Sequence, residues 1–255
     1  MNASSAFISS PKLDTYALYA RALPVLLVAL PGALASVAWF PEAKTWWSAI
    51  SGLLAGCGIP VLLSQIGRDS GKNKESALFE SWGGKPTTRF LRHRDAPNKV
   101  LLAQHHRKLQ DLFSDIRIPS AQDEAANPNG ADEVYDACVA LLREKTRDKQ
   151  RFPILYGELV SYGFRRNLWG MKPLGIAVAL AGTVAISVLL ILRLHQAEPP
   201  SPIAVMVAAS DLLFLAAWLF WIKPDWVRIP AEAYAGQLLI ATENLSGGNK
   251  DGKQS

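Results

Sequence analysis

Cysteine and histidine are scarce in this chain of 255 residues, which has two cysteines and four histidines. Two thiols do not make a disulfide framework, so Cys57 and Cys138 are interpreted as buried structural thiols. His105 and His106 are adjacent, so on a helix they point apart and cannot form a same-face metal pair. We expect His105 to face the core, His106 to be exposed, and no metal or other cofactor to be bound.

Recognisable catalytic motifs are also missing. No Gly-x-Ser-x-Gly sequence and no nucleophile–base set is present. Gly84-Lys85 followed by Thr87 is reminiscent of a phosphate-binding loop. That motif, however, needs glycine where Phe79 stands and serine or threonine where Pro86 stands. The chain also lacks strand alternation and internal repeats, so we predict an all-α protein that is not an enzyme.

Four long apolar runs dominate what the chain does have. Each has about twenty residues, which is the length that crosses a hydrocarbon core of ~30 Å. A polar stretch without a cleavage site precedes the first run, which is therefore not interpreted as a cleaved signal peptide. We predict four transmembrane helices as two hairpins flanking an α-helical domain. The runs are residues 22–40, 46–66, 174–194 and 202–222.

The predicted organisation places the polar part of the chain between the two hairpins. Its divisions are an N-terminal tail (1–21), hairpin 1 (22–66), the central domain (67–173), hairpin 2 (174–222), and an amphipathic helix with a tail (223–255). The segment 67–173 holds 19 of the 27 basic residues and 14 of the 22 acidic ones. Because basic loops remain on the cytoplasmic side, we expect the central domain and both termini to be cytoplasmic.

Small residues line one face of the second run. Ser48, Gly52 and Gly56 recur every four residues, a pattern that lets helices approach closely in lipid. The pattern predicts tight helix packing, either within one chain or between chains.

Asp211 is the residue of the apolar runs that most strongly suggests a function. A carboxylate near the middle of a bilayer costs about 2.5–3.5 kcal/mol, so it faces a bundle interior, a pore or a partner. Ser210, Thr183 and Ser187 are its candidate companions. Two interpretations stay open: a protonated carboxyl that only holds helices together, or a ring of carboxylates that favours cations in a homo-oligomer.

The central domain is predicted to be helical, with helices near residues 75–82, 98–116, 132–148 and 153–170. The segment 118–130 is expected to be a loop. Leu101, His105 and Leu109 are expected on the buried face of the second helix, and Cys138 and Leu141 on that of the third. A last amphipathic helix is predicted to begin at Ile229-Pro230 and to lie on the membrane or on the domain.

Basic and aromatic residues alternate at two places in this domain. Such a combination suits phosphate groups and a stacked base, and it predicts a nucleotide or nucleic-acid contact. A solvated surface and contacts with anionic lipids are the competing interpretations. The candidate ligand-binding residues are Lys85, Arg89, Phe90, Arg92, His93, Arg94, Arg165 and Arg166.

Two stretches carry a resemblance to a known family. They are Glu80-Ser-Trp-Gly-Gly-Lys-Pro-Thr-Thr-Arg-Phe-Leu-Arg-His-Arg-Asp95 and Tyr162-Gly-Phe-Arg-Arg-Asn-Leu-Trp-Gly-Met-Lys-Pro173. With the order of spans and domain, they resemble the four-span membrane effectors of bacterial anti-phage nucleotide-signalling systems, such as the Hailong-type membrane effector. The resemblance implies a homo-oligomer in the bacterial inner membrane that conducts ions. It also implies a nucleotidyltransferase partner whose nucleotide or short DNA product is the signal.

The sequence therefore predicts a homo-oligomeric ion channel or pore-forming effector, in contact with membrane lipids and gated through its cytoplasmic domain. Two alternatives remain: a membrane-tethered adaptor whose domain binds a protein partner, and a membrane-bound enzyme. Asp211 discriminates between pore and tether, because a carboxylate paired within one subunit, without a continuous polar path, favours the tether.

Overall fold

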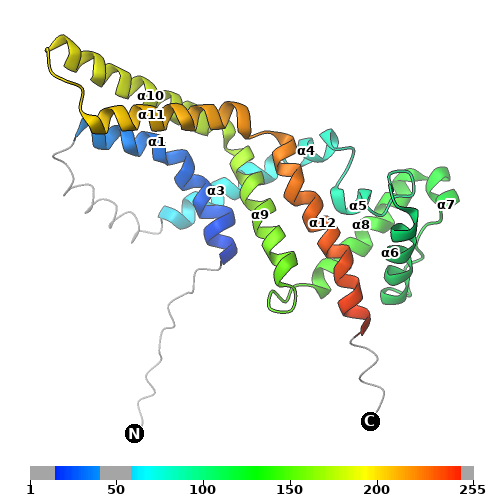
Figure 1. Cartoon of the computed structure of the whole chain (residues 1–255). Coiled ribbons are helices and arrows are strands. Elements are labelled where there is room, and N and C mark those ends of the chain that lie inside the picture. The colour runs from blue at the N-terminus through cyan, green and yellow to red at the C-terminus, as the bar shows by residue number, and fades with distance from the viewer. Residues whose placement is uncertain (1–14, 41–58, 248–255) are drawn as a thin grey trace, which may run out of the picture. The chain divides into compact units, whose positions relative to one another are not determined.

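All regular structure is helical in the computed structural model of this protein, which describes residues 15–40 and 59–247 (Figure 1). The all-α fold class is thus confirmed for the described residues. The chain divides into two compact units. The membrane unit comprises Met1–Asp69 and Met171–Trp218, and the polar unit comprises Ser70–Gly170 and Leu219–Ser255.

Three helices among the described residues are long and apolar enough to cross a membrane. They are formed by η1 (Ala17–Ala22) with α1 (Leu23–Trp39), by α10 (Lys172–His195), and by α11 (Pro202–Ala216) with η3 (Ala217–Trp221). Between 22% and 33% of each span is buried among the described residues, so most of its apolar surface is exposed there. These helices support the prediction of a membrane protein.

The first two predicted runs differ in their bounds from the helices of the structure. The first helix begins at Ala17 and not at residue 22, so Arg21 lies within it, with its guanidinium 5.2 Å from the centre of the Tyr16 ring. The stripe of Ser48, Gly52 and Gly56 lies outside the described residues, so the second span remains a prediction. Helix α3 (Ile59–Asn73) covers the end of that run and extends beyond residue 66.

The membrane unit is held by close packing of α1, α10 and α11. Its apolar cluster combines Ala38 with Ile186, Leu189 and Val207. Trp39 donates a hydrogen bond from Nε1 to the carbonyl of residue 185 at 2.9 Å. Small residues on α10 permit this closeness, since each added methyl group at a contact would force the helices apart.

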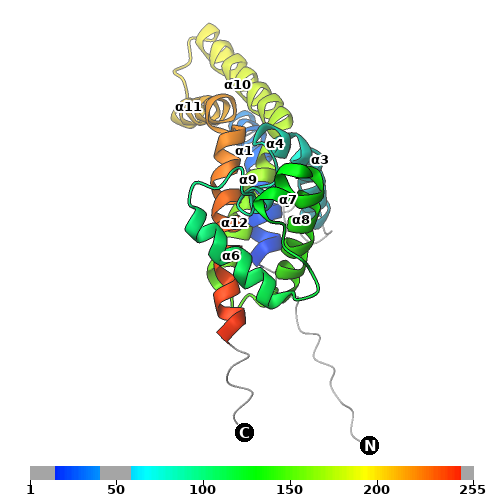
Figure 2. The same ribbon diagram turned by 90° about the vertical axis from the view of Figure 1, so that its right-hand side faces the viewer.

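The polar unit is built around α12 (Pro224–Gly247), which runs along α9 (Pro153–Gly170) and also contacts α5, α6 and α8 (Figures 1 and 2). Its main core gathers Leu91, Leu109, Tyr135, Leu142 and Leu238, all completely buried. The other helices are α4 (Glu75–Ser81), α5 (Pro86–Arg89), α6 (Lys99–Leu112), α7 (Ala121–Ala126) and α8 (Pro128–Lys145).

Several predicted details of the polar unit were wrong. Helix α6 begins after Asn98, whose side chain accepts from the N–H groups of residues 100 and 101, so the buried residue of its first turn is Leu102. Leu101 and Leu141 are 47% and 44% exposed. The predicted loop 118–130 contains α7, which Ser120 and Asp123 start with a reciprocal capping box. The errors at Leu101 and Leu141 arise because a shift of one residue turns a helix face by 100°.

Helix α12 begins at Pro224, five residues before the predicted start, and Pro230 lies inside it. A proline inside a helix leaves the carbonyl four residues earlier without its donor. Here that carbonyl belongs to Trp226, and the Arg165 guanidinium donates to it at 2.9 Å. The same guanidinium lies 4.8 Å from the centre of the Trp226 ring. Arg165 thus compensates the proline and keeps α12 continuous.

Candidate anion-binding cavity

The basic run 85–94 is matched by acidic side chains of the same unit. Lys85 and Thr88 both bind the carboxylate of Asp136 on α8. Arg89 lies 3.8 Å from Asp95 and 3.5 Å from Glu232 on α12. The run therefore joins α5 to α8 and α12.

Arg92 is the most enclosed basic residue of this run, with 9% exposed surface. Its guanidinium donates to Asp132 at 2.6 and 2.8 Å, to Asp95 at 3.0 Å and to the Gly83 carbonyl at 2.7 Å. Gly84 has a φ of 128°, a conformation that side chains rarely adopt, and a Cβ there would lie 2.7 Å from the guanidinium. The absence of a side chain at Gly84 thus leaves the space that the Arg92 guanidinium occupies.

Glu124 organises the residues that follow. This carboxylate is 2% exposed and accepts from the N–H groups of His93 and Arg94 at 2.8 and 3.2 Å. It also accepts from the Arg94 guanidinium at 3.0 Å and from the Tyr135 hydroxyl at 2.9 Å. His93 and Arg94 are therefore tied to α7 and α8.

His106 was predicted to be exposed, and this was wrong. Its ring is half-buried, stacks on Tyr135 with 5.6 Å between centroids, and meets the His93 ring edge-on at 4.8 Å. Its Nε2 lies 2.7 Å from the Leu91 carbonyl. The burial predictions for His105 and Cys138, which are 9% and 0% exposed, are confirmed.

A cationic cavity of about 600 Å³ opens between six helices of the polar unit. Its volume lies within the range of about 300–1,000 Å³ that is usual for small-molecule sites. Six basic side chains and one acidic side chain line it. The charged lining residues are Lys72, Lys85, Arg143, Arg147, Lys149, Arg166 and Glu75.

Two of the basic side chains are available to a ligand. Within the described part of the chain, neither Lys72 nor Arg143 has a carboxylate within 4.0 Å. The exposed pairs of Lys85 with Asp136 and of Arg147 with Glu144 are of the kind that contributes little to stability. An anion can therefore compete for these cations at small cost.

Polar and aromatic groups complete the cavity. Thr87 lines it, and the Thr87 hydroxyl is buried without a hydrogen-bond partner in the part of the chain that the structure describes. Tyr156 also lines it, with the Lys149 ammonium 5.6 Å from its ring centre. Arg166 donates to Glu75 at 2.9 Å, and Glu75 accepts from the Tyr162 hydroxyl at 2.6 Å. Burial, followed by the adjacent Glu75 charge, raises the pKa of Tyr162, which stays neutral.

The cavity gathers only part of the predicted ligand set. Lys85 and Arg166 line it, whereas Arg92, Arg94 and Arg165 are bound to other groups of the protein. Sequence reasoning missed Lys72, Arg143, Arg147 and Lys149. The available signal was the run 143–151, in which every second residue is basic.

The predicted polar residues of the membrane unit do not form one cluster in the described residues. Thr183 donates to the carbonyl of residue 179 at 2.8 Å, and Ser187 to that of Thr183 at 2.7 Å. Asp211 is 0% exposed, and among residues 15–40 and 59–247 neither of its carboxylate oxygens has a hydrogen-bond partner. Ser210 beside it is half-buried.

Asp211 lies close to Gly182 of α10, at a place where the backbone of α1 is also near. A Cβ at Gly182 would lie 2.7 Å from Oδ2 of Asp211 and 3.2 Å from the carbonyl oxygen of Pro31. The absence of a side chain at Gly182 therefore leaves the space that the Asp211 carboxyl group occupies.

No group of three or more histidine, cysteine or acidic residues in the described ranges could hold a metal ion. No protein-family model, curated protein or solved structure matches this chain.

Proposed function

We propose that this protein is a membrane receptor in which the cationic cavity binds an anionic phosphorylated ligand of the nucleotide or short-oligonucleotide class. The observation that carries the proposal is the lining of six basic side chains and one acidic one around about 600 Å³. Phosphate oxygens suit Lys72 and Arg143, and the Thr87 hydroxyl supplies a further donor. Tyr156 offers a surface on which a base can stack.

We further propose that ligand binding controls the membrane helices. Three helices that line the cavity continue into membrane segments. Helix α3 begins in the membrane unit, α9 is followed after one residue by α10, and α12 follows η3 after two residues. A ligand shifts a conformational equilibrium only by its difference in affinity for the two states. A ligand that contacts α3, α9 and α12 has different affinities for two states in which the spacing of these helices differs.

The response we propose is ion conduction by a homo-oligomer in the bacterial inner membrane, used in anti-phage defence. Several copies are needed, because the spans are apolar and their hydroxyl groups are few. The signal would be produced by a nucleotidyltransferase, as the family resemblance implies.

Ligand binding is tested on full-length protein in lipid nanodiscs with ATP and a tetrathymidylate. The double substitution Lys72→Glu and Arg143→Glu should weaken binding at least tenfold, which corresponds to about 1.4 kcal/mol. Arg107→Glu is the matched control, because Arg107 is exposed on α6 and lies outside the cavity. Equal weakening by the control, or no binding of either probe, overturns the proposal.

A membrane-tethered adaptor is the second candidate. The observation that favours it is that Thr183 and Ser187 are satisfied within their own helix, and that Asp211 is enclosed within one protomer. An adaptor would bind its protein partner without any ion current through the purified protein.

A further inference from the structure

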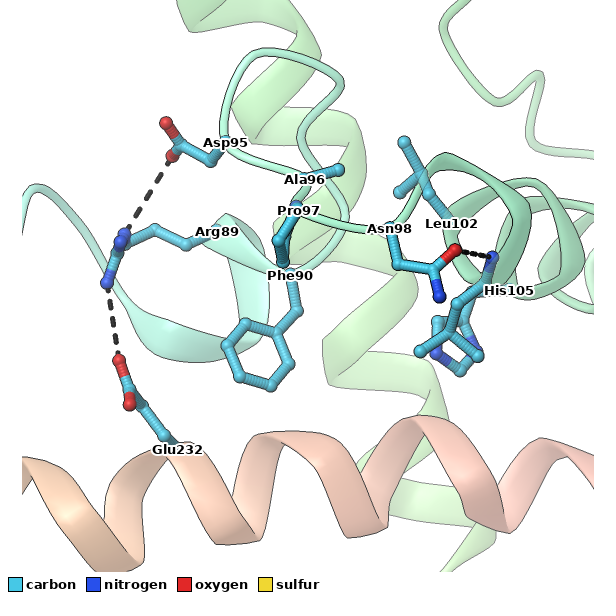
Figure 3. A pocket seen from close by; sticks show the side chains of 10 residues that line it. Arg89, Phe90, Asp95, Ala96, Pro97, Asn98, Leu102, His105 and Glu232 are labelled. Atoms are coloured by element: carbon cyan, nitrogen blue, oxygen red, sulfur yellow. Dashed lines mark hydrogen bonds and ion pairs between the residues drawn. The ribbon is translucent and has the colours of Figure 1, made fainter.

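A second cavity, separate in lining from the cationic cavity, lies on the other face of the contact between α5 and α12. It has a volume of about 320 Å³, which is enough for a ligand of one or two rings. We call it the Phe90 cavity. Figure 3 shows the side chains that line it: Arg89, Phe90, Asp95, Ala96, Pro97, Asn98, Leu101, Leu102, His105 and Glu232.

Each charged side chain of the Phe90 cavity has a partner of opposite sign. Arg89 lies between Asp95 and Glu232, as the dashed lines in Figure 3 mark. Glu232 also accepts from Arg228 at 2.7 Å, and Asp95 from Arg92 at 3.0 Å. A free anion would meet the two carboxylates, and a free cation would meet the guanidinium. The ligand that fits is uncharged.

The cavity has unused hydrogen-bonding groups at its wall. His105 is 9% exposed and makes no hydrogen bond within the described residues. Burial is the main cause that lowers the pKa of His105, so its ring is neutral near pH 7 and offers one donor and one acceptor. Nη1 of Arg89 is ion-paired with Glu232 at 3.5 Å, but it is buried without a hydrogen bond to any described residue.

The apolar part of the wall includes an accessible aromatic ring. Phe90 is 37% exposed, and its Cε2 atom would lie 3.8 Å from a Cβ placed at Gly236 of α12. Its ring is therefore supported by α12 on one side and open on another. Leu101 and Leu102 add aliphatic surface.

We infer that the Phe90 cavity binds an uncharged planar heterocycle, which stacks on Phe90 and hydrogen-bonds at its edge with His105 and Arg89. A nucleobase has this chemistry, because every base combines a π-face with donors and acceptors on its rim. The inference does not depend on the cationic cavity, which selects for phosphate charge. The heterocycle is either a free compound or the base of a nucleotide.

The test uses full-length protein in nanodiscs with adenine and cytosine as probes, followed by saturation-transfer NMR and titration. Both Phe90→Leu and His105→Leu should weaken adenine binding at least fivefold. Two variants are used, and the thermal unfolding of each is measured alongside, so that a loss of packing is distinguished from a loss of ligand contacts. The Lys72→Glu/Arg143→Glu protein should bind adenine as wild type does, which separates this inference from the proposed function.

AMP identifies the source of the heterocycle. Phe90-dependent binding of AMP assigns the site to the base of a nucleotide, and Phe90-dependent binding of adenine without AMP assigns it to a free compound. The inference is overturned if neither base gives saturation transfer, or if adenine binds with unchanged affinity to both folded variants.

Discussion

Glu124, His105 and His106 make the polar unit sensitive to acid. Burial alone would raise the pKa of Glu124, but the N–H groups of His93 and Arg94 and the Tyr135 hydroxyl outweigh it and lower that pKa below 4.5. Burial is the main cause that lowers the pKa of both histidines below 6.5. In each case the unfolded chain binds protons at a higher pH than the folded protein does.

The thermal stability of the polar unit should therefore fall as pH decreases from 7.5 to 5. Stability rises with pH wherever the unfolded state binds more protons, so the histidine contribution is complete above pH 6.5 and declines below it. Glu124 adds a further loss below pH 4.5. Scanning fluorimetry of the full chain in nanodiscs measures this, and His106→Gln should reduce the loss between pH 7.5 and 5. A melting temperature that stays constant or rises over this interval contradicts the assignment.

At the scale of elements, two glycines of α9 have opposite roles. A Cβ at Gly170 would lie 2.5 Å from backbone atoms of Ser70 and Gly71, so α9 and α3 touch there through their backbones. A Cβ at Gly157 would meet nothing within 4 Å. The same substitution at two places in one helix therefore separates packing from helix propensity.

Gly170→Ala should destabilise the protein by about 1–3 kcal/mol, since the contact is with backbone that cannot turn aside. Gly157→Ala should stabilise it by about 0.5–1 kcal/mol, because glycine inside a helix is entropically unfavourable. Unfolding in denaturant, followed by tryptophan fluorescence, measures both. Equal effects of the two substitutions would show that the approach of α9 to α3 is not tight.

Most helices could be predicted from the sequence, but the tertiary contacts that their residues make could not. The bounds of α9, of α10 and of the span formed by α11 with η3 were predicted within about two residues, because proline and glycine mark their ends and apolar runs their lengths. The function of Arg165 could not be predicted, because it depends on Pro230, which lies 65 residues later and meets it only in the folded protein. The contacts of Arg92 and Arg94 with Asp132, and of Arg94 with Glu124, were missed for the same reason.

At the scale of the whole molecule, the chain passes between its two units three times, within α3, at Met171 and near Trp218. Sequence reasoning anticipated a polar domain between apolar hairpins, and it placed the boundaries near residues 66, 173 and 222. It did not anticipate a cationic cavity lined by all three continuing helices, because Lys72, Arg166 and Tyr234 belong to segments that only folding brings together.

Single-channel recording tests the proposed ion conduction by the assembled protein. Purified protein in a planar bilayer should give discrete openings that short oligonucleotides alter. Asp211→Asn should change the conductance or the open fraction at least twofold, because a carboxylate that becomes hydrated on opening attracts cations and an amide does not.

Ser187→Ala is the matched control, since Ser187 is exposed and bonded within α10, and it should leave the current unchanged. A silent bilayer with assembled wild-type protein and both probes would favour the tethered adaptor and direct the search to a protein partner.

The buried side of α10 has a further consequence. Gly175, Ala179, Gly182, Ile186 and Leu189 are separated by four, three, four and three residues, which is a seven-residue period. A straight α-helix drifts by about 20° in each such period, so a helix that keeps this seam against its neighbours winds around them with a left-handed twist. The seam carries glycine beneath Trp218 and beneath Asp211. Rotation of α10 about its own axis would withdraw both glycines in one movement, so the two side chains would lose their enclosure together.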